Sequence, residues 1–202
     1  MDISSIQSNG TTKEKILHTA TMMFAKDGYE NVSMRDLADA VGVQASSLYS
    51  HFESKREILH ALYSAYDAEH QQSRPDMSEL LRLAETEPPL EVIGQMYRHN
   101  DPGVADIMDH IIATATHQVS SDPESAEFVK RHLFDIWPVF LKPLLVRMVE
   151  LGRIEPLDID TFLFLISIYS FGGTALHTSN MEINRDEWAN GYTLLCTLVK
   201  PV

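Results

Sequence analysis

The chain has 202 residues, of which 44% are hydrophobic and 8% aromatic, and 29 acidic against 16 basic side chains give a formal net charge of −13. At this length one or two domains are expected, and the apolar content excludes a chain that is disordered throughout. A charge this negative argues at face value against nucleic acid, because polyanions are bound mainly by neutralising their phosphates with Lys and Arg.

Three features of the sequence bear on where in the cell the protein is expected. The single cysteine, Cys196, has no partner for an internal disulfide, which fits a reducing environment. The polar start has neither the basic nor the apolar region of a secretory signal. The longest apolar run, 162–171, is far shorter than the roughly 20 residues that cross a bilayer. We therefore expect a cytoplasmic protein that makes no contact with a membrane.

Apolar residues recur with helical spacing from the start of the chain. A first helix is expected near 12–27, and Ser33 with Asp36 forms a capping box for a short second helix that ends at Gly42. A third helix is expected over 44–52, with Ala45, Leu48 and Phe52 as its inward stripe. Ser54 can cap a longer fourth helix that extends to residue 70.

The remaining pattern stays helical and contains no clean alternation, so the fold class is all-α. Prolines 138 and 143 lie inside one long segment, where they predict a kink or a division into two helices. We expect about nine helices in total, with the later ones over residues 76–87, 90–99, 103–119, 123–151, 159–179 and 185–199.

Charge is distributed unevenly along the chain. Residues 11–56 contain six basic and six acidic side chains, whereas residues 57–202 contain 10 basic and 22 acidic ones. The first segment is therefore neutral and the second carries a charge of −12. Nucleic-acid binding is thus excluded less firmly for the first segment than for the whole chain.

The second and third short helices, joined by a turn that contains Gly42, have the arrangement that places a helix in the major groove of DNA. Small polar residues face outward on the third helix, beside Tyr49. Hydroxyl and amide groups can bond to base edges or phosphates, and small side chains allow close approach.

The segment from about 12 to 60 resembles the DNA-binding domain of TetR-family transcriptional regulators. The resemblance rests on Phe24-Ala25-x-x-Gly28-Tyr29, Ser33-Met34-Arg35-Asp36-Leu37-Ala38, Val41-Gly42-Val43, Leu48-Tyr49-x-His51-Phe52 and Ser54-Lys55-x-x-Ile58-Leu59. It implies DNA contacts by Arg35, Ser46, Ser47, Tyr49, His51 and Lys55, and base preference set at Gln44 and Ala45.

The polar residues 1–10 are expected to form a flexible tail. A DNA-binding domain follows at 11–56, with its helix-turn-helix at about 33–52, and the resemblance implies a helical ligand-binding and dimerisation domain at 57–202. Dimerisation is expected through the last two long helices, 159–179 and 185–199. The run 161–171 supports this, because a helix that is apolar all round needs covering on both sides.

The effector site is harder to place. Ligand pockets are mostly apolar with a few polar groups, a description that also fits any helical core. The acidic domain indicates a neutral or cationic effector, and no cofactor or metal is expected. The candidate lining residues are Met96, Tyr97, Met108, His110, Thr114, His117, Phe134, Trp137, Phe164 and Tyr169.

The function predicted is that of a homodimeric transcriptional regulator, a repressor released from a palindromic operator by a small molecule, and not an enzyme. One alternative is a DNA-binding protein without an effector. The other is a helical metal-carboxylate enzyme, since Glu57 and His60 have the Glu-x-x-His spacing of di-iron bundles, although one helix cannot supply both halves of such a site.

Overall fold

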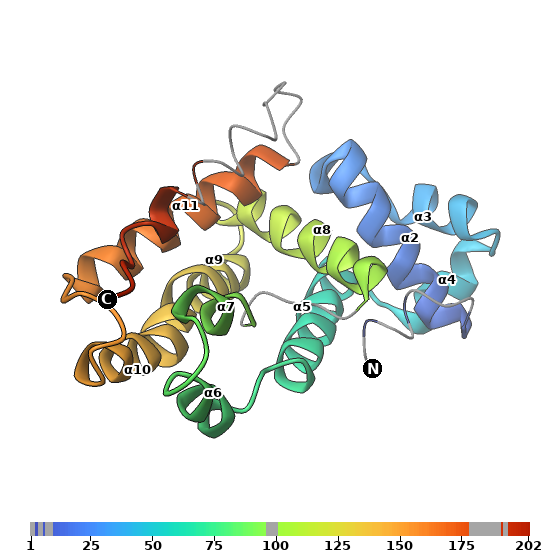
Figure 1. The fold of residues 1–202 in the computed structure, drawn as a ribbon. Helices are drawn as coiled ribbons and strands as arrows, with labels where there is room; N and C mark the ends of the chain where they lie inside the picture. The colour runs from blue at the N-terminus through green and yellow to red at the C-terminus, as the bar shows by residue number, and fades with distance from the viewer. Residues whose placement is uncertain (1–2, 4–5, 7–9, 96–100, 178–190, 192–193) are drawn as a thin grey trace. The chain divides into compact units, whose positions relative to one another are not determined.

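The computed structural model describes residues 3, 6, 10–95, 101–177, 191 and 194–202 (Figure 1). Within these residues every regular element is helical, and extended pairing is limited to one isolated antiparallel bridge between Ile154 and Pro201. The all-α prediction is therefore confirmed.

The helices begin and end within a few residues of the predicted bounds in most places. Of the predicted helix 185–199, only residues 191 and 194–199 lie within the described residues. In chain order the elements are α2 (Thr12–Asp27), η1 (Tyr29–Asn31), α3 (Met34–Val41), α4 (Ala45–His51), α5 (Lys55–Gln72), α6 (Met77–Leu83), α7 (Pro89–Gly94), α8 (Pro102–Gln118), α9 (Pro123–Val129), η3 (Lys130–Asp135), α10 (Ile136–Glu150) and α11 (Ile159–His177).

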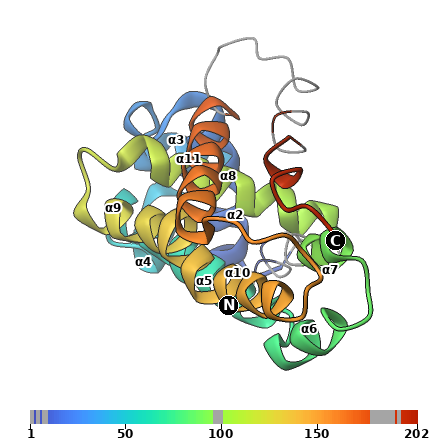
Figure 2. The ribbon, with the colours of Figure 1, turned by 60° about the vertical axis from the view of Figure 1, so that its left-hand side comes forward.

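The chain forms two compact units. Unit 1 comprises residues 1–73 and 99–126, and unit 2 comprises residues 74–98 and 127–202. Packing thus groups all of α5 and all of α8 with the predicted helix-turn-helix, because α8 lies against α2 and α5 (Figures 1 and 2). The boundary between a DNA-binding domain at 11–56 and a ligand-binding and dimerisation domain at 57–202 stays a prediction.

The short helices of unit 1 begin and end where the sequence signals predict. The Ser33 hydroxyl accepts a hydrogen bond from the Asp36 amide at 3.1 Å, and the Asp36 carboxylate accepts from the Ser33 amide at 2.9 Å. This capping box satisfies amide donors that the first turn of α3 leaves open. Gly42 ends α3 with φ at +78°, a left-handed conformation that costs glycine least.

Removing the Ser33 hydroxyl should therefore destabilise unit 1. We expect Ser33→Ala to lower the free energy of unfolding by about 1 kcal/mol. The Ser33 hydrogen bonds also lower the pKa of Asp36. A carboxylate whose pKa is lower in the folded than in the unfolded protein stabilises the fold at pH values above its unfolded-state pKa. This contribution is lost as the pH falls through the folded-state pKa. Urea unfolding at neutral pH and near pH 3 should show a smaller difference between wild type and variant at the lower pH.

Unit 2 is built around α10 and α11, which pack side by side (Figure 2). Its buried core draws on α6, α7, α10 and α11, and on Ile154 and Val199 beyond them. Arg153 donates to the carbonyls of Thr86 and Glu87 at 3.2 and 2.9 Å, which fixes the segment between α6 and α7.

The predicted division of segment 123–151 is present, but its form differs from a simple proline kink. The helix widens into the π-helical turn η3 just before Pro138, whereas Pro143 lies inside α10. Pro138 cannot donate to the carbonyl four residues earlier and crowds it, so a wider turn at that point relieves the clash.

Candidate nucleic-acid interface

The two faces of α4 differ sharply in burial. Leu48 and Phe52 are 0% and 1% exposed, whereas the Tyr49 side chain is 52% exposed. Leu48 and Phe52 hold the helix against the core of unit 1, and Tyr49 is left on the surface. The predicted inward position of Ala45 is wrong, because Ala45 is exposed at the first turn of α4.

Four of the predicted DNA-binding residues surround one surface hollow. The hollow has a volume of about 690 Å³ and lies where α3, the turn at Gly42 and the start of α4 meet. Arg35, Gln44, Ala45 and Tyr49 line it, together with Asp39 and Val43. A guanidinium, an amide, a methyl group and a phenol are thus brought to one place by two helices that are separate in sequence.

Asp39 was missed by sequence reasoning. It is exposed on α3 and lines the hollow beside the predicted DNA-binding residues. Its position one turn beyond Arg35 on a helix was the available signal, because residues three or four apart share a helix face.

The remaining predicted contacts on α4 do not line this hollow. Ser46 is exposed, and Ser47 and His51 are partly buried. The outward Ser50 turns back on its own helix and donates to the Ser47 carbonyl at 2.6 Å. DNA contact by Ser46, Ser47 and His51 stays a prediction.

Lys55 is engaged within the protein. Its Nζ donates to the Tyr29 carbonyl at 2.6 Å and lies 4.2 Å from the centre of the Tyr29 ring. Partial burial lowers the pKa of its amine. Lys55 thus ties the start of α5 to η1, and the predicted phosphate contact would require the amine to leave this carbonyl.

The predicted effector-site residues fall in both units or outside the described residues. On α8, Met108 and Thr114 are buried, His110 is partly buried and His117 is exposed. In unit 2, Phe134, Trp137 and Tyr169 are partly buried and Phe164 is 59% exposed. Met96 and Tyr97 lie outside the described residues. Their roles stay predictions.

Two further tests concern other functional classes. Among the described residues, no three His, Cys, Asp or Glu side chains are grouped as metal ligands, and His60 instead lies 2.9 Å from Glu124 and 3.4 Å from Asp122. No helix in the described part of the chain has the length and apolar character needed to cross a bilayer.

The comparison with protein families supports the reading of α3 and α4. Residues 16–62 match the family of bacterial regulatory proteins described as the tetR family. The matched segment begins in α2 and ends in α5, so it contains α3, α4 and the hollow between them. The resemblance predicted for about residues 12–60 is thereby confirmed.

Relatives are named as regulators of transcription. The chain is 27% identical over 150 residues to YezE of Bacillus subtilis, an uncharacterized HTH-type transcriptional regulator, over 72% of this chain and 74% of YezE. It is 39% identical over 46 residues to IcaR of Staphylococcus aureus, a negative transcriptional regulator of the biofilm operon icaADBC. That second match spans 23% of this chain and only 25% of IcaR.

A solved structure extends the similarity of fold to nearly the whole chain. The structure of AibR in complex with isovaleryl coenzyme A and operator DNA matches with a TM-score of 0.54 and 16% identity, over 95% of this chain and all of that one. At this identity the match supports the fold, since one fold hosts many functions.

Proposed function

Because the amino-terminal domain of this chain belongs to the TetR family of bacterial regulatory proteins, we propose that the chain is a dimeric repressor that a small molecule releases from a palindromic operator. The match over residues 16–62 carries this proposal, together with the exposed outer face of α4. The negative regulator IcaR and the AibR complex with its ligand and operator support it. The role implies a cytoplasmic location.

In this proposal α4 enters the major groove of DNA. Gln44 and Ala45 lie at its start, where they would meet base edges, while Arg35 and Tyr49 flank them at the hollow. The amide of Gln44 can bond to a base, and Ala45 offers a methyl contact to thymine at most. With so few base contacts, specificity depends on two half-sites being read together.

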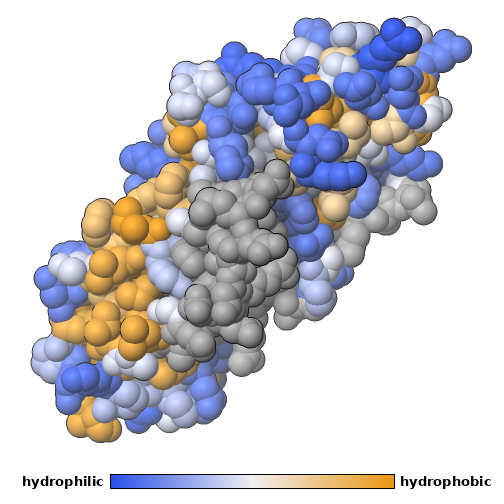
Figure 3. Space-filling view, turned by 90° about the horizontal axis from the view of Figure 1, so that it is seen from above, coloured by the Kyte–Doolittle hydropathy of each residue, from blue (hydrophilic) through white to orange (hydrophobic). Residues whose placement is uncertain are grey.

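Exposed apolar side chains of unit 2 support a dimer. On α11, Phe164, Leu165 and Ile168 are 59%, 40% and 47% exposed, and Val139 of α10 is 61% exposed. Figure 3 shows apolar surface gathered on this side of unit 2. Apolar patches of this kind on soluble proteins mark contact sites, and we assign this one to a second copy of the chain.

A charge placed on this surface should break the dimer. We expect Phe164→Glu to shift the protein from a dimer to the 22.8 kDa monomer, because the carboxylate would be desolvated in the interface. Leu90→Glu is the matched control, since Leu90 is 42% exposed on α7 of the same unit. Analytical ultracentrifugation separates the two states. A Phe164→Glu protein that stays dimeric would remove α11 from the proposed interface.

Asp39 should limit binding to DNA of random sequence. A carboxylate at the DNA-facing hollow repels phosphates, so we expect Asp39→Asn to raise affinity for random duplex several-fold at low salt. The gain should shrink as salt screens the repulsion. Fluorescence anisotropy across a salt series measures both effects. Glu53→Asn, an exposed acid outside the hollow, serves as control, and equal gains in both variants would mean that only net charge matters.

Selection of bound duplexes from fragmented genomic DNA tests the proposed function. The expected result is a recurrent palindrome whose half-sites lie about one DNA turn (~34 Å) apart. Metabolites that copurify with the protein can then be identified by mass spectrometry and titrated against this duplex. Release by one of them supports the repressor mechanism, whereas no enrichment of any sequence would contradict it.

A further inference from the structure

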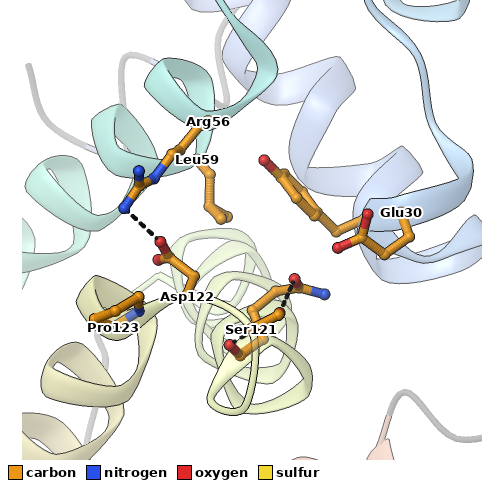
Figure 4. Close-up of a pocket in the computed structure, with 8 residues that line it drawn as sticks. Glu30, Arg56, Leu59, Ser121, Asp122 and Pro123 are labelled. Atoms are coloured by element: carbon orange, nitrogen blue, oxygen red, sulfur yellow. Dashed lines mark hydrogen bonds and ion pairs between the residues drawn. The ribbon is translucent and has the colours of Figure 1, made fainter.

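Unit 1 contains a second cavity, which shares no lining residue with the hollow between α3 and α4. It has a volume of about 240 Å³ and is lined by η1, the first turns of α5 and the corner between α8 and α9 (Figure 4). The lining residues are Tyr29, Glu30, Arg56, Leu59, Gln118, Ser121, Asp122 and Pro123.

A buried amide in this lining has unused donors. Gln118 is only 6% exposed, and its side-chain oxygen accepts from the Ser121 hydroxyl at 2.9 Å. Its amide nitrogen makes no hydrogen bond within the described part of the chain. Because this nitrogen is open to solvent and is not sealed in the core, it can donate to an acceptor placed in the cavity.

One end of the cavity holds an ion pair whose guanidinium still has unused donors. The Arg56 guanidinium bonds to Asp122 through Nη2 at 2.8 Å, which leaves most of its donors for another acceptor. Asp122 also accepts from the amide and hydroxyl of Ser125 at 2.9 and 2.7 Å. Asp122 is therefore largely occupied, whereas Arg56 can still bind a carboxylate.

The other end is anionic. Glu30 lies across the cavity from Arg56 and Asp122 (Figure 4). Its carboxylate makes no hydrogen bond or ion pair with the described residues. Between the two ends lie the Tyr29 phenol and the apolar side chains of Leu59 and Pro123. Burial raises the pKa of Tyr29, which keeps the phenol protonated as a donor.

We propose that this cavity binds a small zwitterion of amino-acid size. Its carboxylate bonds to Arg56 and Gln118, its ammonium group lies against Glu30, and a short side chain contacts Leu59 and Pro123. A simple anion would be repelled by the carboxylates of Glu30 and Asp122, and a simple cation by the guanidinium of Arg56, so a molecule that carries both charges is favoured.

The site connects segments on both sides of the helix-turn-helix. Glu30 belongs to η1, which precedes α3, and Arg56 lies in the first turn of α5, which follows α4. A ligand that joins them restrains the segments from which α3 and α4 extend. Binding of the ligand is therefore expected to change the affinity of the protein for its operator. Only this expectation rests on the proposed function, and the binding site itself does not.

Calorimetry of the full chain without DNA tests the site directly. The probes are glycine, L-alanine, L-serine and L-valine, with propionate and ethylamine as analogues of alanine that lack one charged group. We expect saturable binding of at least one amino acid and binding of each analogue at least about tenfold weaker than that of alanine, because each lacks one charge-assisted contact.

Two variants examine the contacts. Gln118→Leu and Glu30→Gln should each weaken amino-acid binding by about tenfold or more, while Gln72→Leu, an exposed position on α5, should leave it unchanged. Glu30 is exposed, so Glu30→Gln should fold even if Gln118→Leu does not. No binding of any amino acid, or equal binding by wild type and Glu30→Gln, would overturn the proposal, whatever the protein does with DNA.

Discussion

Replacing Tyr49 with alanine should weaken operator binding by about tenfold or more without changing the stability of the protein. A hydrogen bond to a charged phosphate contributes about 1.5–3 kcal/mol, which corresponds to roughly a tenfold to hundredfold change in affinity. Tyr49 is 52% exposed, so truncation leaves no cavity in the core. Anisotropy with the selected operator gives the affinity, and urea unfolding gives the stability.

Tyr49→Phe separates the hydroxyl from the ring. If the phenol donates to a phosphate, most of the loss seen with alanine should already appear with phenylalanine. If the ring alone packs on the DNA backbone, phenylalanine should bind like wild type. Wild-type affinity in Tyr49→Ala would show that α4 does not face DNA in the proposed way.

Replacing the neighbouring Leu48 with alanine should have the opposite pattern. Leu48 is 0% exposed, and a leucine truncated in a packed core costs about 2–5 kcal/mol of unfolding free energy. We expect a large shift of the urea midpoint, because Leu48 anchors α4 to unit 1. Operator binding should fall only as far as the folded fraction does.

Comparison of two consecutive residues makes the test specific. Leu48→Ala and Tyr49→Ala lie on the same helix and both truncate a large side chain, so a general weakening of α4 would affect stability and binding together in both variants. Stability lost only in Leu48→Ala and intrinsic affinity lost only in Tyr49→Ala would separate anchoring from recognition. A stable Leu48→Ala protein would contradict the packing described for α4.

Local signals in the sequence were enough to place the helices of unit 1. The Ser33 hydroxyl and the left-handed Gly42 act within a few residues, so the start and end of α3 could be predicted. The position of Ala45 could not, because its burial depends on where α3 ends relative to the first turn of α4. Helical spacing alone assigned it to the inward stripe, and its place at the helix end left it exposed.

Contacts between distant segments were the harder part. The bond from Lys55 to the Tyr29 carbonyl joins residues 26 positions apart, and no spacing rule links them. Asp39 could be placed on the exposed side of α3, but its place beside Arg35 and Tyr49 required the turn at Gly42 to be known. The cavity at Gln118 likewise depends on how α8 returns to η1.

The uneven distribution of charge along the chain explains how a protein with a net charge of −13 can still present a surface suited to DNA. The neutral segment 11–56 contains the hollow, and the excess acid begins beyond it. A chain with few cations at its interface binds non-specific DNA weakly, and binding that depends on phosphate contacts falls steeply with salt. The proposed function therefore predicts that specific binding needs two copies of α4 on one operator.

Hydroxyl-radical footprinting on the selected operator measures this requirement most directly. We expect two protected stretches on one face of the duplex, related by the palindrome and separated by about one helical turn (~34 Å). At a protein concentration only just sufficient to protect the operator in wild type, both should be lost together in Tyr49→Ala and in the dimer-breaking Phe164→Glu. A single protected stretch, or protection that persists in both variants, would contradict recognition of DNA by paired α4 helices.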